Sequence, residues 1–165
     1  MTDRPNILLL HWHDLGRCLG AYGWSGVSSP GLDRLAEEGV VCTNAFCTTP
    51  LCSPARGALF TGRYPFQNGL MGLIPQGWNY HAGERTWPAV LREHGYHAAL
   101  IGQQHESFKL QALGFDTIRY VSGWPNCDRV EPLAHEFLRR EALSSQPFFA
   151  SIGFFDVHRM GDQHY

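Results

Sequence analysis

The sequence predicts an α/β fold in which a mixed, largely parallel sheet is flanked by helices. Continuous apolar runs at residues 5–10, 97–101 and 147–155 are typical of buried strands, helix-forming segments alternate with them, and polar titratable residues follow each run. The chain of 165 residues is 44% hydrophobic and 17% charged, which is enough apolar material for one core. We therefore expect a single domain.

The first elements are expected near the N-terminus. The uninterrupted apolar character of residues 5–10 predicts a strand buried on both faces of a parallel sheet. Residues 29–39 have a serine N-cap, a proline at the first helical position and a closing glycine, which together predict a short helix. The apolar run at residues 40–46 predicts a second strand.

The later elements follow from the same signals. They are helices at residues 53–61, 86–94 and 129–143 and strands at residues 97–101 and 147–155. The first of these helices begins immediately after Cys52, so this cysteine is expected at a helix N-terminus.

Composition excludes several classes of function. A formal net charge of −2 gives no electrostatic reason to expect nucleic acid or an anionic membrane as a partner. The first apolar run is too short for a signal peptide and no segment reaches transmembrane length, so we expect a cytoplasmic protein. The five cysteines contain no Cys-x-x-Cys pair, which argues against structural disulfides and a cysteine zinc site.

Titratable residues follow three of the predicted strands. They are His13 with Asp14, His105, and Asp156 with His158. Because ligand sites in open α/β folds gather at the carboxyl ends of strands, we expect these residues to meet. Asp156 is also a good candidate for a helix N-cap.

Cys52 and Arg56 form a second candidate pair. A helix N-terminus favours a thiolate or another anion, and Arg56 lies one turn further along the same face. An anionic substrate would be held between the two. Taken alone, a Cys-x-x-x-Arg pair is more often a small buried cysteine beside an unrelated surface arginine.

The wider run at residues 52–63, Cys-Ser-Pro-Ala-Arg-Gly-Ala-Leu-Phe-Thr-Gly-Arg, resembles the signature of the sulfatase family. The resemblance extends from Pro5-Asn6-Ile7 to Asp156-Val157-His158, and the Phe-Asp-x-His-Arg ending at Arg159 is most similar to heparan N-sulfatase-like members. It implies an alkaline-phosphatase-like fold. Residues 1–165 would be the N-terminal part of a sulfatase catalytic domain, incomplete at the C-terminus.

The resemblance also implies a nucleophile and a reaction. Cys52 would be oxidised to formylglycine by a formylglycine-generating enzyme that reads Cys52, Pro54 and Arg56. The aldehyde hydrates to a diol, one hydroxyl of which attacks sulfur with the help of a divalent cation, while the other later loses its proton and expels sulfate. The expected substrate is a small-molecule or saccharide sulfate ester or a sulfamate.

The implied metal ligands are Asp14, His13 and the modified Cys52. Asp14 matches the second acid of the family's Asp-Asp pair and suits Ca²⁺, the cation we expect. His13 stands where the first aspartate is expected, and imidazole is a poor ligand for Ca²⁺ but a good one for transition metals. Mg²⁺, Mn²⁺ and Zn²⁺ therefore stay open.

Two histidines match catalytic positions of the family. His105 matches a histidine that contacts the formylglycine diol and accepts its proton, and His158 matches one that protonates the leaving group. Gln103 stands where family members often have lysine, which removes a positive contact to the sulfate.

Three alternatives remain. A phosphonate or phosphate monoester hydrolase would share the fold and the nucleophile. An inactive fragment would lack the two further metal ligands that the family supplies from later sequence. A zinc-dependent amidohydrolase would use His11 and His13 as a His-x-His pair, but its barrel needs more βα units than 165 residues supply.

Overall fold

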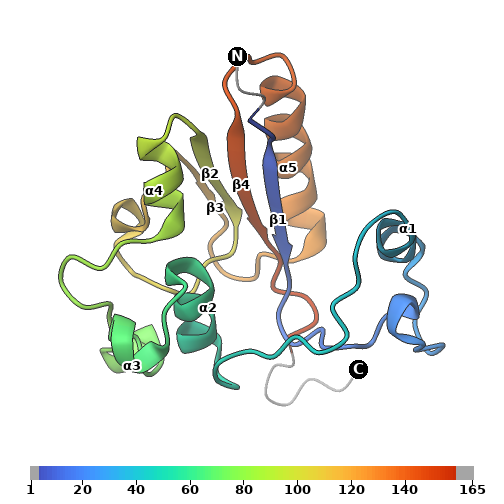
Figure 1. Ribbon diagram of the computed structural model, residues 1–165, viewed down its shortest axis with the longest axis horizontal. Helices are drawn as coiled ribbons and strands as arrows, with labels where there is room; N and C mark the ends of the chain where they lie inside the picture. The colour runs from blue at the N-terminus through green and yellow to red at the C-terminus, as the bar shows by residue number, and fades with distance from the viewer. Residues whose placement is uncertain (1–3, 159–165) are drawn as a thin grey trace.

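A four-stranded sheet in the order β1-β4-β2-β3 organises the computed structural model, which describes residues 4–158 (Figure 1). The strands are β1 (Ile7–His11), β2 (His97–Gly102), β3 (Thr117–Tyr120) and β4 (Phe148–Gly153). All three neighbouring pairs of described strands are parallel. The predicted α/β class with a largely parallel sheet is confirmed.

Helices lie on both faces of this sheet (Figure 1). The α-helices are α1 (Pro30–Glu38), α2 (Cys52–Thr61), α3 (Pro65–Asn68), α4 (Trp87–Glu93) and α5 (Cys127–Glu141). Three short 3₁₀ segments are η1 (Gly20–Tyr22), η2 (Ile74–Gln76) and η3 (Leu110–Leu113). None of the helices described in residues 4–158 has the length and apolarity needed to cross a membrane.

The core is divided by the two central strands. Every residue of β4 is buried, and side chains alternate between the two faces of the sheet. Ile152 packs on the face that α5 covers, whereas Phe149 packs on the opposite face with Leu100 and with Phe60 of α2. Full burial of one such side chain stabilises the fold by about 1.5–3 kcal/mol.

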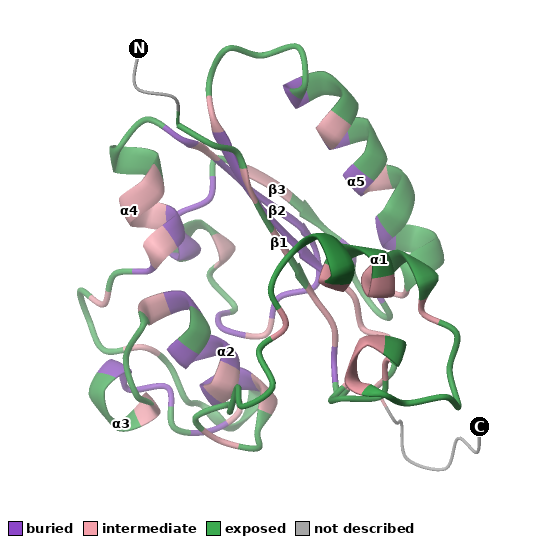
Figure 2. Cartoon of the chain, turned by 45° about the vertical axis from the view of Figure 1, so that its right-hand side comes forward, coloured by how far each residue is buried: buried purple, intermediate pink, exposed green. Residues whose placement is uncertain are grey.

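Strand β1 differs from its prediction because it lies at the edge of the sheet. Ile7 and Leu9 pack against the core on one face, while Leu8 and Leu10 on the other face are 46% and 37% exposed. The prediction that β1 is buried on both faces is therefore wrong, because intermediate and exposed residues alternate along the strand and none of them is buried (Figure 2).

Residues 40–46 form no strand, so the prediction for this segment is also wrong. The described strands are already paired in a continuous sheet, and within residues 4–158 this segment lies outside it and makes no backbone–backbone hydrogen bond. Its apolar side chains face solvent, with Val40 and Phe46 90% and 89% exposed. An apolar run predicts a strand only where a neighbouring strand can complete its hydrogen bonds.

Candidate functional site

Three strand ends converge, as the sequence predicts. The loop after β1 continues to pair with the loop after β4, because the His13 N–H donates to the Asp156 carbonyl and the Val157 N–H to the His13 carbonyl, each at 3.2 Å. The loop after β2 joins them through the Gln103 N–H, which donates to the Gly153 carbonyl at 2.8 Å. Polar side chains from three distant segments are thereby held at one edge of the sheet.

Glycines at the ends of β2 and β4 allow this close approach. Gly102 has a φ of +80°, and a Cβ there would lie 2.2 Å from the Gly153 carbonyl oxygen. A Cβ on Gly153 would lie 2.3 Å from the Gln103 carbonyl oxygen. Any larger residue at these positions would push the two loops apart.

His13 lies at the centre of the converging loops. Its side chain is only 3% exposed, and its ring centroid is 4.9 Å from that of His158 and 6.2 Å from that of His105. Its Nε2 is buried without a hydrogen-bond partner among the described residues. The Nδ1 of His105 is buried and unpartnered in the same way.

The electrostatics of the site keep the rings of His13 and His105 neutral. Burial, reinforced by the charge of Arg56 and by His158 and His105, lowers the pKa of His13 to about 3. Burial and the charge of Arg56 also lower the pKa of His105. A neutral imidazole has a lone pair free to accept a proton or bind a metal, so both residues have the protonation state that those roles require.

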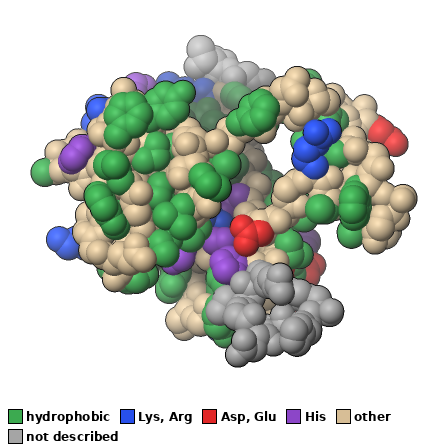
Figure 3. All heavy atoms as spheres, turned by 90° about the horizontal axis from the view of Figure 1, so that it is seen from below, with side chains coloured by type: hydrophobic (Ala, Val, Ile, Leu, Met, Phe, Trp, Pro, Cys, Tyr) green, Lys and Arg blue, Asp and Glu red, His purple; other side chains and the backbone are tan. Residues whose placement is uncertain are grey.

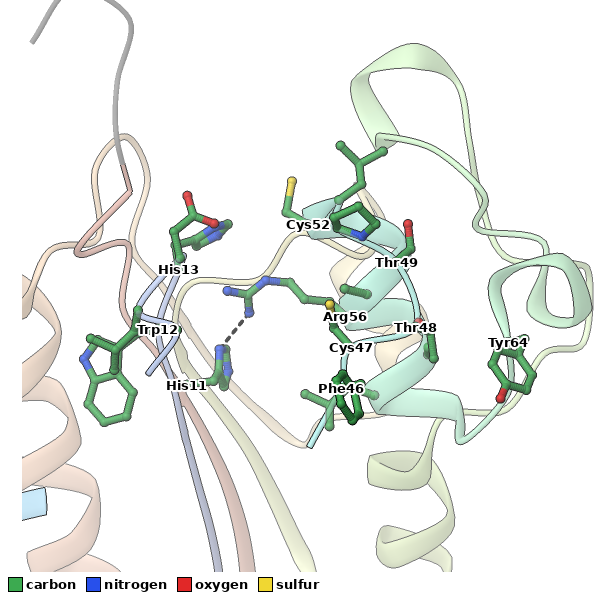
Figure 4. A pocket seen from close by; sticks show the side chains of 18 of the residues that line it. His11, Trp12, His13, Phe46, Cys47, Thr48, Thr49, Cys52, Arg56 and Tyr64 are labelled. Carbon is green, nitrogen blue, oxygen red and sulfur yellow. Dashed lines mark hydrogen bonds between the residues drawn. The ribbon is translucent and has the colours of Figure 1, made fainter. Parts of the chain in front are cut away.

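Residues of α2 and of the loop after β1 line an open cavity of about 980 Å³. Figure 3 shows histidine side chains gathered beside an acidic side chain on the same face of the molecule. Cys52 lies at the N-terminus of α2 as predicted, although the helix begins at Cys52 itself and not at Ser53, and the residue at the N-cap position makes no side-chain capping bond. His13 lies on one side of the cavity and Cys52 and Arg56 on the other (Figure 4), and Asp14 also lines the cavity. The N–H groups at the start of α2 are therefore available to an anion.

Arg56 is held in the wall of the cavity and is only 7% exposed. Its Nη1 donates to Nδ1 of His11 at 2.7 Å (Figure 4). Sequence reasoning used His11 only in the rejected zinc pair with His13, yet the structure turns the His11 ring to Arg56. The only signal for this role was the place of His11 at the end of a strand.

The geometry of a metal site is met by His13, Asp14 and His158. One potential ligand atom from each residue lies within 4.8 Å of the other two. Among the described residues, Cys52 is not part of this group, although it shares the cavity with His13 and Asp14. Arg159, the last residue of the Phe-Asp-x-His-Arg motif, lies outside the described residues.

Two further polar residues lie behind the site. Gln103 is 5% exposed, and its Oε1 has no hydrogen-bond partner within residues 4–158. Glu106, which the sequence analysis did not single out, accepts a hydrogen bond from the His105 N–H at 2.6 Å. Burial raises the pKa of Glu106 despite the opposing charge of Arg56, so this carboxyl tends toward its neutral form.

Several known proteins are similar to this chain in sequence. Human arylsulfatase D is 39% identical to the chain in an alignment 174 residues long, gaps included, that covers 91% of the chain and 29% of that protein. Human N-sulphoglucosamine sulphohydrolase is 31% identical in an alignment 173 residues long that covers 96% of the chain and 33% of that protein. The chain thus spans about a third of the length of these relatives.

A solved structure shows the same fold. It is a protein bound to its substrate, D-glucosamine-2-N,6-O-disulfate, and it matches 94% of this chain and 35% of its own length with a TM-score of 0.79 and 23% identity. The family model described as sulfatase matches residues 5–165. The chain belongs to the sulfatase family.

Proposed function

We propose that the protein hydrolyses a sulfate ester or a sulfamate, with formylglycine made from Cys52 as its nucleophile. The observation that carries the proposal is the position of Cys52, which begins α2 on the wall of a cavity that His13 and Asp14 also line. Membership of the sulfatase family supports the same chemistry. Modification of Cys52 requires a formylglycine-generating enzyme as a partner.

The anionic group of the substrate binds between the start of α2 and Arg56. The helix start supplies the backbone N–H groups of Cys52 and Ser53 and the positive end of the helix dipole, whereas Pro54 has no N–H. Arg56 adds a guanidinium that the protein has already oriented through His11. Charge-assisted hydrogen bonds of this kind strengthen as negative charge accumulates on the transferred group.

His105 and His158 carry the proton transfers. Because burial and Arg56 lower the pKa of His105, its ring is neutral and able to accept the proton of the diol when sulfate leaves. His158 donates a proton to the departing oxygen or nitrogen. Its ring stacks on Phe155 with centroids 4.6 Å apart, which fixes its plane beside His13.

The residues present fit a divalent cation. His13 and Asp14 would hold it, because His13 offers a neutral ring with an unpartnered buried nitrogen and Asp14 offers a carboxylate. A bound cation would supply Lewis-acid stabilisation of the nucleophile. Calcium is the family-based expectation, but the imidazole of His13 among the ligands favours Mn²⁺ or Zn²⁺ over Ca²⁺.

A saccharide is the proposed substrate class. Two of the matched proteins act on sulfated glucosamine, one by its name and the other by the substrate bound to it. The size of the cavity, about 980 Å³, is sufficient for a ligand of this class.

The decisive experiment is mass spectrometry of the peptide that contains Cys52, after expression together with a formylglycine-generating enzyme. We expect the thiol-to-aldehyde mass change at Cys52 and none at Cys47, an exposed cysteine of the same cavity wall. An unmodified Cys52 would remove the mechanism.

Activity is then measured on an aryl sulfate, a sulfamate and a phosphonate monoester with a full-length form. Cys52→Ala should lower kcat/KM for the sulfate or sulfamate by at least about 10³-fold, whereas Cys47→Ala should leave it within about threefold. Preference for the phosphonate would favour the alternative hydrolase of the same fold.

A further inference from the structure

His11 links the sheet to the anion-binding side of the cavity. It is the last residue of β1, and its ring lies between Ser151 of β4 and Arg56 of α2. The Nε2 of His11 is 3.0 Å from the Ser151 hydroxyl, and the Nδ1 is 2.7 Å from Arg56 Nη1. Ser151 is fully buried in the interior of β4, so this end of the chain of hydrogen bonds is fixed.

The hydrogen-bonding capacity of its two partners determines which ring nitrogen of His11 carries the proton. A guanidinium only donates hydrogen bonds, so the Nδ1 of His11 must present its lone pair to Arg56. The ring proton is then on Nε2, which donates to the Ser151 hydroxyl. The resulting series of hydrogen bonds runs from Arg56 to His11 to Ser151 and uses both ring nitrogens of a neutral imidazole.

Because the acceptor that orients Arg56 is the neutral ring of His11 and not a carboxylate, the two do not form an ion pair. Buried arginines are usually paired with acids, but among residues 4–158 Arg56 forms no ion pair with a carboxylate. Its guanidinium is oriented by His11, and no carboxylate of the described residues is bonded to it; the nearby Glu106 carboxyl, which feels the charge of Arg56, tends toward its neutral form. The charge is thus available to whatever anion occupies the cavity beside Cys52.

We propose that His11 is a positioning residue that, anchored by Ser151, holds the Arg56 guanidinium in the cavity that Cys52 also lines, while leaving its charge available to a sulfate group. This inference rests on the proposed function, because it concerns the anion subsite of the same cavity. It adds a residue outside the sulfatase signature to the machinery that binds the transferred group.

Substitutions at His11 test the orientation of the Arg56 guanidinium without removing its charge. In His11→Asn the side-chain oxygen can replace Nδ1 as a neutral acceptor, whereas His11→Leu removes the acceptor. The probe is inorganic sulfate, titrated calorimetrically into the protein with Cys52 as an unmodified thiol. We expect a Kd within about threefold of the native value for His11→Asn and a Kd at least about tenfold weaker for His11→Leu.

The Ser151→Ala variant tests the anchor. It leaves the acceptor of Arg56 in place but removes the partner of Nε2, so sulfate affinity should fall less than in His11→Leu. In a full-length form, His11→Leu should raise KM more than it lowers kcat, and His11→Asn should restore KM. Native sulfate affinity in a folded His11→Leu variant would overturn the proposal.

Nitrogen NMR of the His11 ring gives a readout that does not depend on any variant or on catalysis. We expect protonated Nε2 and unprotonated Nδ1 in the native protein. A proton on Nδ1 would overturn the proposal even if Cys52 were modified and the enzyme active. Conversely, an unmodified Cys52 would contradict the proposed reaction and leave the His11 tautomer and the sulfate titration as tests of this inference.

Discussion

The carboxylate Oδ2 of Asp156 accepts a hydrogen bond from the Cys127 backbone N–H at 2.6 Å, although the two residues are 29 positions apart. Cys127 is the first residue of α5, and Asn126, the residue at the N-cap position, makes no side-chain capping bond. Asp156 therefore caps α5 from the end of β4. The N-cap role expected of Asp156 is present, but it serves a helix that precedes it in the sequence.

Removing this cap should destabilise the protein. We expect Asp156→Ala to lower the free energy of unfolding by about 1 kcal/mol, because one N–H at the start of α5 loses its acceptor and the helix dipole loses a compensating charge. Asp156→Asn keeps an acceptor and should lose less than half as much. Urea unfolding measures both, and equal losses in the two variants would contradict the capping role.

The close contact between the ends of β2 and β4 predicts that Gly102→Ala lowers the free energy of unfolding more than Gly77→Ala does. Gly77→Ala introduces strain at a φ of +91° but meets no atom within 4 Å, so it should cost about 1–2 kcal/mol. Gly102→Ala has similar backbone strain and adds a Cβ 2.2 Å from the Gly153 carbonyl oxygen. We expect it to cost roughly 3 kcal/mol or more in thermal unfolding. Equal costs would refute the steric argument.

The pair of Glu141 and His97 predicts a pH dependence of stability. Burial alone would raise the pKa of Glu141, but hydrogen bonds from His97 at 3.0 Å and from Arg140 at 3.2 Å outweigh it and hold that pKa below its usual value. A depressed acid pKa contributes stability above the unfolded-state pKa of about 4.3, and the contribution disappears as pH falls through the folded-state pKa.

Urea unfolding between roughly pH 3 and pH 7 checks this sign. The native protein should lose stability more steeply on acidification than Glu141→Gln. Glu131→Gln, which changes an exposed acid of the same helix, should follow the native curve. Parallel curves for the native protein and Glu141→Gln would show that this pair does not contribute.

His13 predicts a specific change in metal preference. His13→Asp adds a second carboxylate oxygen donor beside Asp14 and should strengthen Ca²⁺ binding by about tenfold, or about 1.4 kcal/mol, while weakening Zn²⁺ binding. His135→Asp, at an exposed position of α5, controls for the added charge. Calorimetric titration with each ion measures the two affinities, and unchanged values for both ions would place His13 outside the metal shell.

The sequence predicted those features of the site that depend on local signals and sheet logic. Cys52 begins a helix as expected, because the helical pattern starts directly after it. His13, His105 and His158 approach one another because parallel strands end at the same edge of the sheet. These predictions need only the order of the elements.

Contacts between distant segments could not be predicted in this way. The hydrogen bond between Arg56 and His11 joins residues 45 positions apart and depends on where α2 packs against the sheet. The strand expected at residues 40–46 failed because local apolarity does not show whether a partner strand exists. Strand β3 was not predicted, since its four residues, Thr117–Tyr120, are partly exposed and have no continuous apolar pattern.

The positive charge of Arg56 has a consequence for the end of the proposed catalytic cycle. In the proposed reaction, inorganic sulfate is released when the diol expels it from the nucleophile, and this dianion meets the same guanidinium and the same helix start that held the substrate. The positive charge that strengthens substrate binding also slows the release of sulfate. We therefore expect inorganic sulfate to inhibit the reaction, and its departure from the cavity to compete with bond cleavage as the step that limits turnover.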